Sequence, residues 1–104
     1  MMAAEECRFL VLVPYDAREG ISLSVAAKRA GKSESTVRSW CVQHGLGRRV
    51  GGGVWVVSQV ALAMFLDDDR IALAAYLCGD RASSGVKQYF ERCGVPLPKA
   101  AVSP

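Results

Sequence analysis

One segment of the chain, residues 33–44, carries small polar and basic side chains at helical spacing. Its outward side, drawn as a helix, holds Ser35, Arg38, Ser39 and Val42. Small side chains let a helix enter a groove deeply, and an arginine can bind a phosphate or donate to a guanine edge. This pattern predicts a helix that contacts double-stranded DNA in the major groove.

The opposite side of the same helix is largely apolar, so we expect it to face a core. Ser33 is a suitable N-cap, because its hydroxyl can accept a hydrogen bond from an amide of the first turn. Glu34 in that turn complements the helix dipole. The core-facing stripe, at positions i, i+3, i+4 and i+7, consists of Val37, Trp40, Cys41 and His44.

Basic residues are concentrated around this helix. The whole chain has a net charge of +3, but residues 28–49 hold six basic side chains against Glu34, a local charge of +5. A single arginine or lysine is usually just solvated, whereas such a cluster is typical of a nucleic-acid-binding protein. The predicted phosphate contacts are Lys28, Arg29, Lys32, Arg48 and Arg49. The predicted contacts on or beside the groove are Ser35, Thr36, Arg38 and Ser39.

A preceding helix must position this segment. It is predicted to begin after an N-cap at Ser22 and to end before Gly31, which suits the C-terminal end of a helix. Only Gly31 and Lys32 then separate it from the Ser33 cap, so the two helices predict a helix-turn-helix. The first helix allows a close approach by the second, because three of its stripe residues are alanine: Leu23, Ala26, Ala27 and Ala30.

A hairpin is predicted directly after the second helix, over residues 48–57. Three glycines at 51–53 separate Arg48-Arg49-Val50 from Val54-Trp55-Val56-Val57, and the flanking runs suit strands. Beside a recognition helix such a hairpin is a wing. The alternative is a flexible loop, whereas a phosphate-cradling loop lacks the lysine and the helix that it requires.

The rest of the chain supplies short flanking elements. Residues 9–13 predict a strand, stopped by Pro14, that could pair with the hairpin. After an N-cap at Ser58, a helix over 59–66 is apolar nearly all round, which favours a place inside the domain or under a partner.

Two further helices are predicted beyond that point. Asp67–Asp69 suit the start of a helix over 70–77, and a metal site is disfavoured because three contiguous aspartates lack spaced ligands. The last helix begins near Ser83 or Ser84 and ends at Gly94. Together these elements predict one α+β, mainly helical domain, 1–104: N-terminal strand 9–13, winged core 21–66, C-terminal helical extension 68–94 and tail 95–104.

Cysteine and histidine usage gives little support for metal binding or catalysis. The four cysteines lie far apart without a Cys-x-x-Cys pair, and Cys41 with His44 would need further metal ligands that are not nearby. The same pair is the one nucleophile–base candidate, and both residues are predicted to be buried. We therefore expect no enzyme, no metal and no cofactor. Without a signal peptide or an apolar run of spanning length, we expect reduced thiols in a cytoplasmic, nucleoid-associated bacterial or phage protein, with no membrane partner.

Residues 21–66 resemble the winged helix-turn-helix domains of the excisionase and MerR type. The resemblance depends on the segments Ile21–Ala27 and Gly31–Trp40, with paired alanines, a glycine, a serine cap and a Thr-Val-Arg-x-Trp sequence. It implies that helix 33–44 enters the major groove and that hairpin 48–57 contacts phosphates or the adjacent minor groove. The flanking elements are not the coiled coil and effector domain of MerR regulators, so no small-molecule effector is expected.

The leading hypothesis is sequence-dependent binding of double-stranded DNA, as a transcriptional regulator or an excisionase-like architectural factor. Because one domain covers a short half-site, a homodimer or a head-to-tail array on DNA is expected. The alternatives are a protein-interaction adaptor and a phage DNA-packaging module similar to terminase small subunits, both with the same fold.

Overall fold

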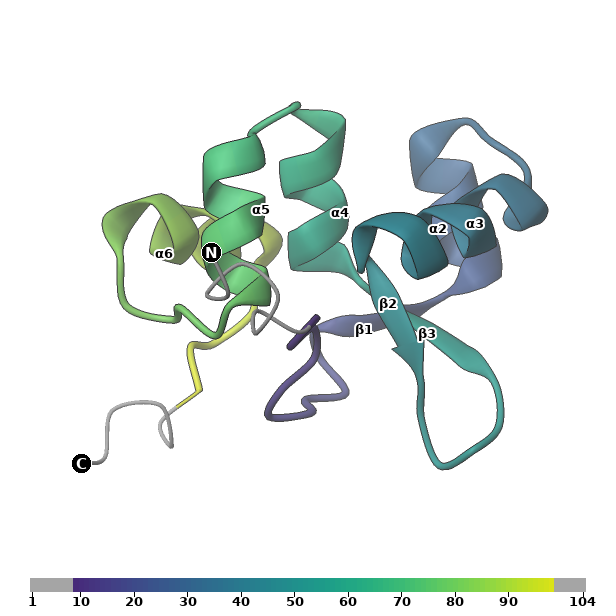
Figure 1. Cartoon of the computed structure of the whole chain (residues 1–104), viewed down its shortest axis with the longest axis horizontal. Coiled ribbons are helices and arrows are strands. Elements are labelled where there is room, and N and C mark those ends of the chain that lie inside the picture. The colour runs from purple at the N-terminus through teal and green to yellow at the C-terminus, as the bar shows by residue number, and fades with distance from the viewer. Residues whose placement is uncertain (1–8, 99–104) are drawn as a thin grey trace, which may run out of the picture.

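The computed structural model describes residues 9–98 of the chain. They contain a three-stranded antiparallel sheet and five helices (Figure 1). The strands are β1 (Gly20–Ser22), β2 (Gly47–Arg49) and β3 (Trp55–Ser58), in the order β1-β3-β2. The helices are α2 (Leu23–Ala30), α3 (Glu34–His44), α4 (Gln59–Leu66), α5 (Arg70–Leu77) and α6 (Ser84–Cys93). About half of these residues are helical, so the α+β class is confirmed.

Helices α2 and α3 begin and end where the capping residues predict. Ser22 Oγ accepts from the Val25 amide at 3.1 Å, and Ser33 Oγ accepts from the Thr36 amide at 3.2 Å. Each helix ends at a left-handed residue, a conformation that glycine adopts without a steric penalty. The two helices are therefore joined by three residues, 31–33, and pack against each other.

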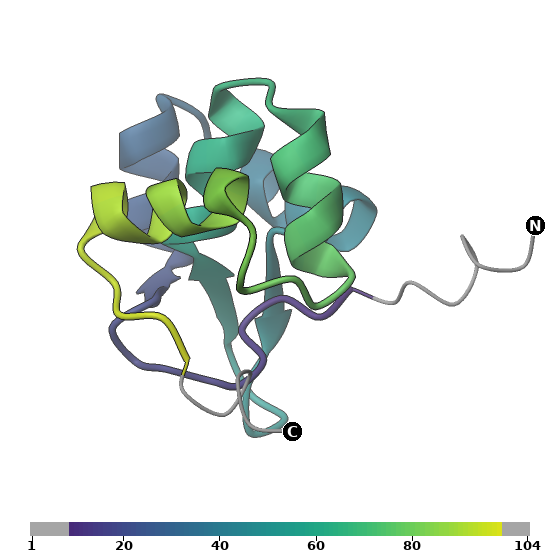
Figure 2. The same cartoon turned by 90° about the vertical axis from the view of Figure 1, so that its left-hand side faces the viewer.

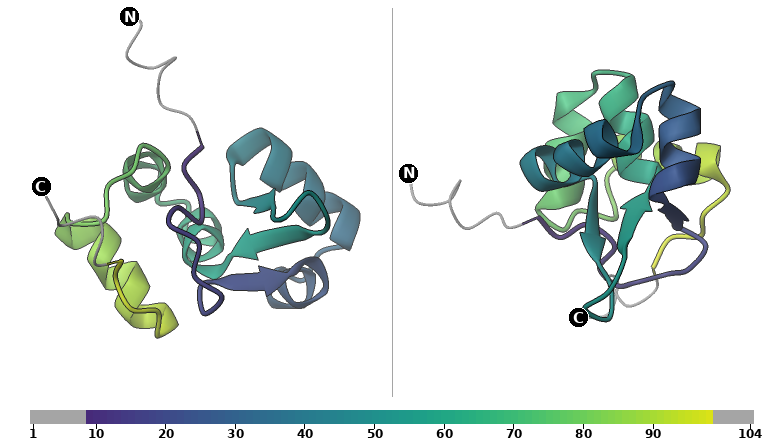
Figure 3. Two further views of the ribbon diagram at one scale, coloured as in Figure 1. Left: turned by 90° about the horizontal axis from the view of Figure 1, so that it is seen from below. Right: turned by 90° about the vertical axis from the view of Figure 1, so that its right-hand side faces the viewer.

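The predicted strand over residues 9–13 is wrong, and the third strand is β1 instead. β1 pairs antiparallel with β3, with Ile21 opposite Val57. Residues 9–13 cannot extend as a strand because Leu12 has a positive φ of 57° and is fully buried together with Val11. The left panel of Figure 3 shows this purple segment passing between the sheet and the helical part.

The predicted hairpin is present as β2 and β3. Arg48 lies opposite Val56 and Arg49 opposite Trp55. The connecting residues 50–54 project away from the helices, as Figures 1 and 2 show.

Helix α4 occupies the middle of the molecule, between the sheet and the other C-terminal helices. It contacts β3, α2, α5 and α6, and four of its side chains are buried: Val60, Ala61, Leu62 and Met64. Of the two predicted positions for this apolar helix, the one inside the domain is therefore confirmed. The two predicted C-terminal helices, α5 and α6, are also present, with N-caps at Asp69 and Ser83.

A buried polar cluster connects the sheet to the helical part. Glu19, Ser58 and Tyr76 are each at most 2% exposed. Ser58 Oγ donates to Glu19 Oε2 at 2.6 Å, and the Tyr76 hydroxyl donates to the same carboxylate oxygen. That hydroxyl accepts from the Leu12 amide at 2.9 Å. Burial, reinforced by Glu19, raises the pKa of Tyr76, so the phenol stays protonated.

Arg81 closes this cluster from the helical side. Its guanidinium carbon lies 3.9 Å from the centre of the Tyr76 ring, and the residue as a whole is 6% exposed. It donates to the carbonyls of Tyr76 at 2.7 Å, Leu10 at 2.8 Å and Val13 at 3.0 Å. The N-terminal segment is thus held by Arg81, by the Tyr76 hydroxyl and by a backbone bond from the Leu10 amide to the Leu77 carbonyl, rather than by a strand partner.

The cysteines differ from one another. Cys41 and Cys93 are free thiols, whereas Cys78 is disulfide-bonded. The expectation that all thiols are reduced is therefore wrong for Cys78. Within residues 9–98, every helix is too short to cross a membrane as an apolar span.

Candidate nucleic-acid interface

The outer face of α3 is open to solvent. Ser35, Arg38 and Ser39 are exposed, and the next residue on this face, Val42, is 61% exposed. On the inner face Val37 and Cys41 are buried, and Trp40 packs against Phe65 with ring centres 4.8 Å apart. The orientation predicted for this helix is therefore confirmed.

Two residues of the predicted inner stripe need comment. His44 is exposed, so its predicted burial is wrong, although its ring still lies 5.0 Å from that of Phe65. Burial raises the pKa of the Cys41 thiol to about 11, which leaves little thiolate at neutral pH. A buried thiol and an exposed imidazole do not make a working nucleophile–base pair.

Arg38 is an exposed cation on the outer face. Within residues 9–98 its guanidinium has no hydrogen-bond or ion-pair partner, so all its donors are open to an external acceptor. Thr36 differs, because its hydroxyl accepts from Ser33 Oγ at 2.9 Å and the residue is half-buried. Thr36 is therefore a part of the helix cap.

The flanking basic residues are not equivalent. Lys28, Lys32 and Arg49 are exposed, and Arg49 Nε donates to the Gly53 carbonyl at 3.1 Å within the hairpin. Arg29 is also exposed, but its Nη1 donates to Gln59 Oε1 at 2.9 Å.

Arg48 has a different position from its neighbour. It is half-buried, and its Nε and Nη2 donate to the carbonyls of Val11 at 3.1 Å and Leu12 at 2.9 Å. These bonds orient the guanidinium toward the N-terminal segment, so among the predicted phosphate contacts Arg48 has the least freedom to meet a phosphate.

Ion pairing leaves the basic segment positively charged. The ion pairs of the described residues join Arg18 to Asp16, Arg70 to Asp68 and Arg92 to Asp67. All of them lie outside residues 28–49, where Glu34 is the single acidic side chain. The positive potential over α2, α3 and the hairpin is therefore not cancelled by adjacent carboxylates.

The hairpin tip presents backbone rather than bulky side chains. Residues 51–54 are exposed, and a Cβ added at Gly51 or Gly52 would meet no neighbouring atom within 4 Å. Val54, the last residue before β3, is 75% exposed, whereas Trp55 is half-buried against the core. Such a tip can approach a phosphate backbone closely.

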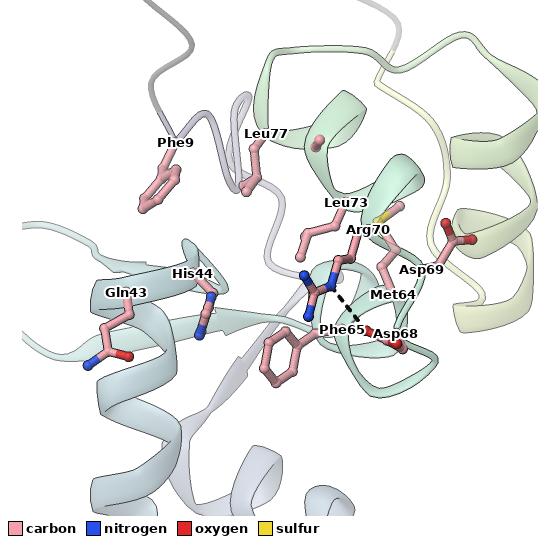
Figure 4. A pocket seen from close by; sticks show the side chains of 11 residues that line it. Phe9, Gln43, His44, Met64, Phe65, Asp68, Asp69, Arg70, Leu73 and Leu77 are labelled. Atoms are coloured by element: carbon pink, nitrogen blue, oxygen red, sulfur yellow. Dashed lines mark hydrogen bonds and ion pairs between the residues drawn. The ribbon is translucent and has the colours of Figure 1, made fainter. Parts of the chain in front are cut away.

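A groove of about 480 Å³ lies where the C-terminal end of α3 meets α4 and α5 (Figure 4). In Figure 4 His44 faces Phe65 and the guanidinium of Arg70, with Leu73 behind and Phe9 at one side. These residues come from three distant parts of the chain, so no spacing in the sequence indicates the groove.

The described residues contain no cluster of three or more His, Cys, Asp or Glu side chains able to hold a metal ion. Comparison of the chain with protein-family models, curated proteins and solved structures gives no match. Function is therefore inferred from the geometry and charge of the chain alone.

Proposed function

We propose that the protein binds double-stranded DNA as a winged helix-turn-helix domain. In this proposal α3 enters the major groove, and the β2–β3 hairpin is a wing over the backbone or the adjacent minor groove. The observation that carries it is the outer face of α3, where an unpaired Arg38 stands between Ser35 and Ser39 on a helix flanked by uncompensated basic residues.

The exposed basic residues divide into two roles. Arg38 donates to a guanine edge or a phosphate in the groove, while Ser35 and Ser39 keep the helix surface low enough to enter it. The phosphate contacts come from Lys28, Lys32 and Arg49, with Arg29 as a further contact once it leaves Gln59. Thr36 and Arg48 act by positioning: Thr36 supports the helix cap, and Arg48 fixes the base of the hairpin.

Sequence-dependent binding would require more than one copy, because α3 spans only a short half-site. A homodimer or a head-to-tail array on DNA suits a transcriptional regulator, an excisionase-like architectural factor or a DNA-packaging protein. These roles share one biochemical activity and differ in the DNA target.

The activity is tested by measuring duplex affinity by fluorescence anisotropy at several salt concentrations. We expect Arg38→Ala to weaken binding about tenfold or more, the range for an arginine–base contact. Lys32→Ala should lower the slope of log affinity against log salt by about 0.9, the value for one lost phosphate contact. Arg92→Ala, which removes an exposed arginine on α6, is the matched control and should leave both unchanged.

Failure of the wild-type protein to bind any duplex at low salt would overturn this proposal. It would favour the second candidate, a protein-interaction adaptor. One observation supports that alternative: the groove between α3, α4 and α5 is lined in part by the apolar side chains of Phe9, which is 48% exposed, Phe65 and Leu73. Apolar side chains exposed beside a groove are typical of protein contact surfaces.

A further inference from the structure

We propose that Val42 selects a base that carries a methyl group at C5, thymine or 5-methylcytosine, within two base pairs of the guanine bound by Arg38. This inference rests on the proposed DNA-binding function and adds a sequence requirement to it. The ligand class is a duplex that presents a guanine edge and a C5 methyl side by side in the major groove.

The position of Val42 carries the inference. An exposed valine alone is ordinary on a protein surface. Val42, however, follows Arg38 by four positions and Ser39 by three, so all three side chains share one face of α3. It is 61% exposed and is the single apolar side chain on that otherwise polar outer face.

The dimensions of a helix and a duplex agree with the spacing. Four residues of an α-helix rise about 6 Å, and successive bases of one strand are separated by about 3.4 Å. A helix aligned with the groove therefore places Val42 about two base pairs from the position under Arg38. The small side chain of Ser39 between them leaves room for a methyl group to approach.

The chemistry of the major groove then selects the base. All four bases present hydrogen-bonding groups there, but thymine alone of the unmodified bases adds a C5 methyl beside its O4 acceptor. A valine offers no donor or acceptor, so a polar edge opposite it loses hydration without gaining a partner. Contact between one methyl group and the isopropyl group changes affinity about fourfold, the value for one buried methyl-sized group.

The experiment first isolates bound duplexes from a randomised pool and then replaces each thymine of the selected site with uracil, which removes only the methyl group. The guanine bound by Arg38 is the one whose replacement abolishes the effect of Arg38→Ala. We expect a thymine-to-uracil replacement at one position within two base pairs of that guanine to lower the duplex affinity about fourfold. Cytosine at that position should bind as weakly as uracil, and 5-methylcytosine should restore the thymine affinity.

Val42→Ala should lose most of the affinity difference between the methylated and unmethylated duplexes at that position, because the shorter side chain withdraws from the C5 methyl group. This variant is expected to fold, because the side chain is exposed and alanine favours a helix. Val25→Ala, the same change at an exposed valine on α2, is the matched control and should keep the methyl preference.

The outcomes separate this inference from the function on which it rests. A wild-type protein that binds duplex DNA with no methyl-dependent position overturns the inference and leaves the proposed function standing. A methyl preference that persists in Val42→Ala overturns it as well. Absence of all duplex binding overturns both.

Discussion

Arg38 and Arg81, which lie in different halves of the molecule, have opposite surroundings. In the half built from the sheet, α2 and α3, Arg38 points to solvent without a partner among the described residues. In the half built from α4, α5 and α6, Arg92 binds Asp67 at 2.7 Å and Arg81 is buried against carbonyls. The same residue type thus joins distant segments of the chain at Arg81 and has all its donors exposed to solvent at Arg38.

Arg48 lies in the sheet half of the molecule but is hydrogen-bonded in the same way as Arg81. By sequence it belongs to the basic half, yet its bonds to Val11 and Leu12 resemble those that Arg81 makes with Leu10 and Val13. Two arginines from different halves therefore hold one N-terminal segment between them. Charge counted along the chain predicts where cations are abundant, but the nearby acceptors decide which of them are available.

Of the substitutions considered, replacement of Arg81 should cause the largest loss of unfolding free energy. Arg81→Met should cost about 3 kcal/mol or more of unfolding free energy, because several buried carbonyls lose their donor. Duplex affinity of the folded protein should stay within about twofold, since a change below about 0.4 kcal/mol is expected for a remote site. Chemical denaturation and anisotropy measure the two quantities, and a stable variant with impaired DNA binding would remove the contrast between the halves.

The adjacent pair Arg48 and Arg49 tests the contrast at one location. Arg48→Met should lower the unfolding free energy by about 1–3 kcal/mol, the cost of leaving partly buried acceptors unpaired. Arg49→Met should leave stability within about 0.5 kcal/mol, as for most surface changes, and should reduce the salt slope of duplex binding by about 0.9. Chemical denaturation and anisotropy titrations at several salt concentrations are carried out on both variants. Equal changes in stability and in salt slope for the two variants would contradict the proposed difference between Arg48 and Arg49.

The smallest effect concerns acid stability of the helical half. Hydrogen bonds from Arg92 and Tyr89 lower the pKa of Asp67 below its ordinary value of 3.8. A carboxyl with a lowered folded-state pKa stabilises the protein above its unfolded pKa, and this contribution is lost as the pH falls below 3.8 toward the folded value.

Asp67→Asn should therefore flatten the acid limb of the stability curve between pH 4 and pH 2, a direction expected from proton linkage. Thermal unfolding across that range measures it, and Asp68→Asn, at the exposed pair with Arg70, is the control. An unchanged acid limb in the Asp67 variant would show that the Arg92–Asp67 ion pair contributes nothing to stability.

Local signals predicted most of the secondary structure. The N-caps at Ser22, Ser33 and Ser58 and the glycines after α2 and α3 act within a few residues of their position, so each is visible in the sequence. The exposed face of α3 was predictable for the same reason, because helical periodicity alone places Ser35 and Arg38 on one side.

Long-range contacts account for what the sequence did not reveal. Residues 9–13 have the composition of a strand, but their carbonyls accept from arginines 36 to 71 positions away. Glu19 and Tyr76 are separated by 57 positions, and no spacing indicates that they meet. The role of Arg48 was not predictable either. Arg48 and Arg49 are adjacent arginines in the same strand, and only the contact of Arg48 with the distant carbonyls of Val11 and Leu12 distinguishes them.

The hairpin is fixed at one end only. Arg48 donates from β2 to the carbonyls of Val11 and Leu12, while the turn between the strands is mostly glycine, and a Cβ added at Gly51 or Gly52 would meet no neighbouring atom within 4 Å. Changes of conformation in the hairpin are thus expected in the connecting residues 50–54, because Arg48 holds its base in place. If the proposed DNA binding holds, the tip can adapt to duplexes of different groove width while the position of α3 stays unchanged, which would separate tolerance of DNA shape from recognition of bases.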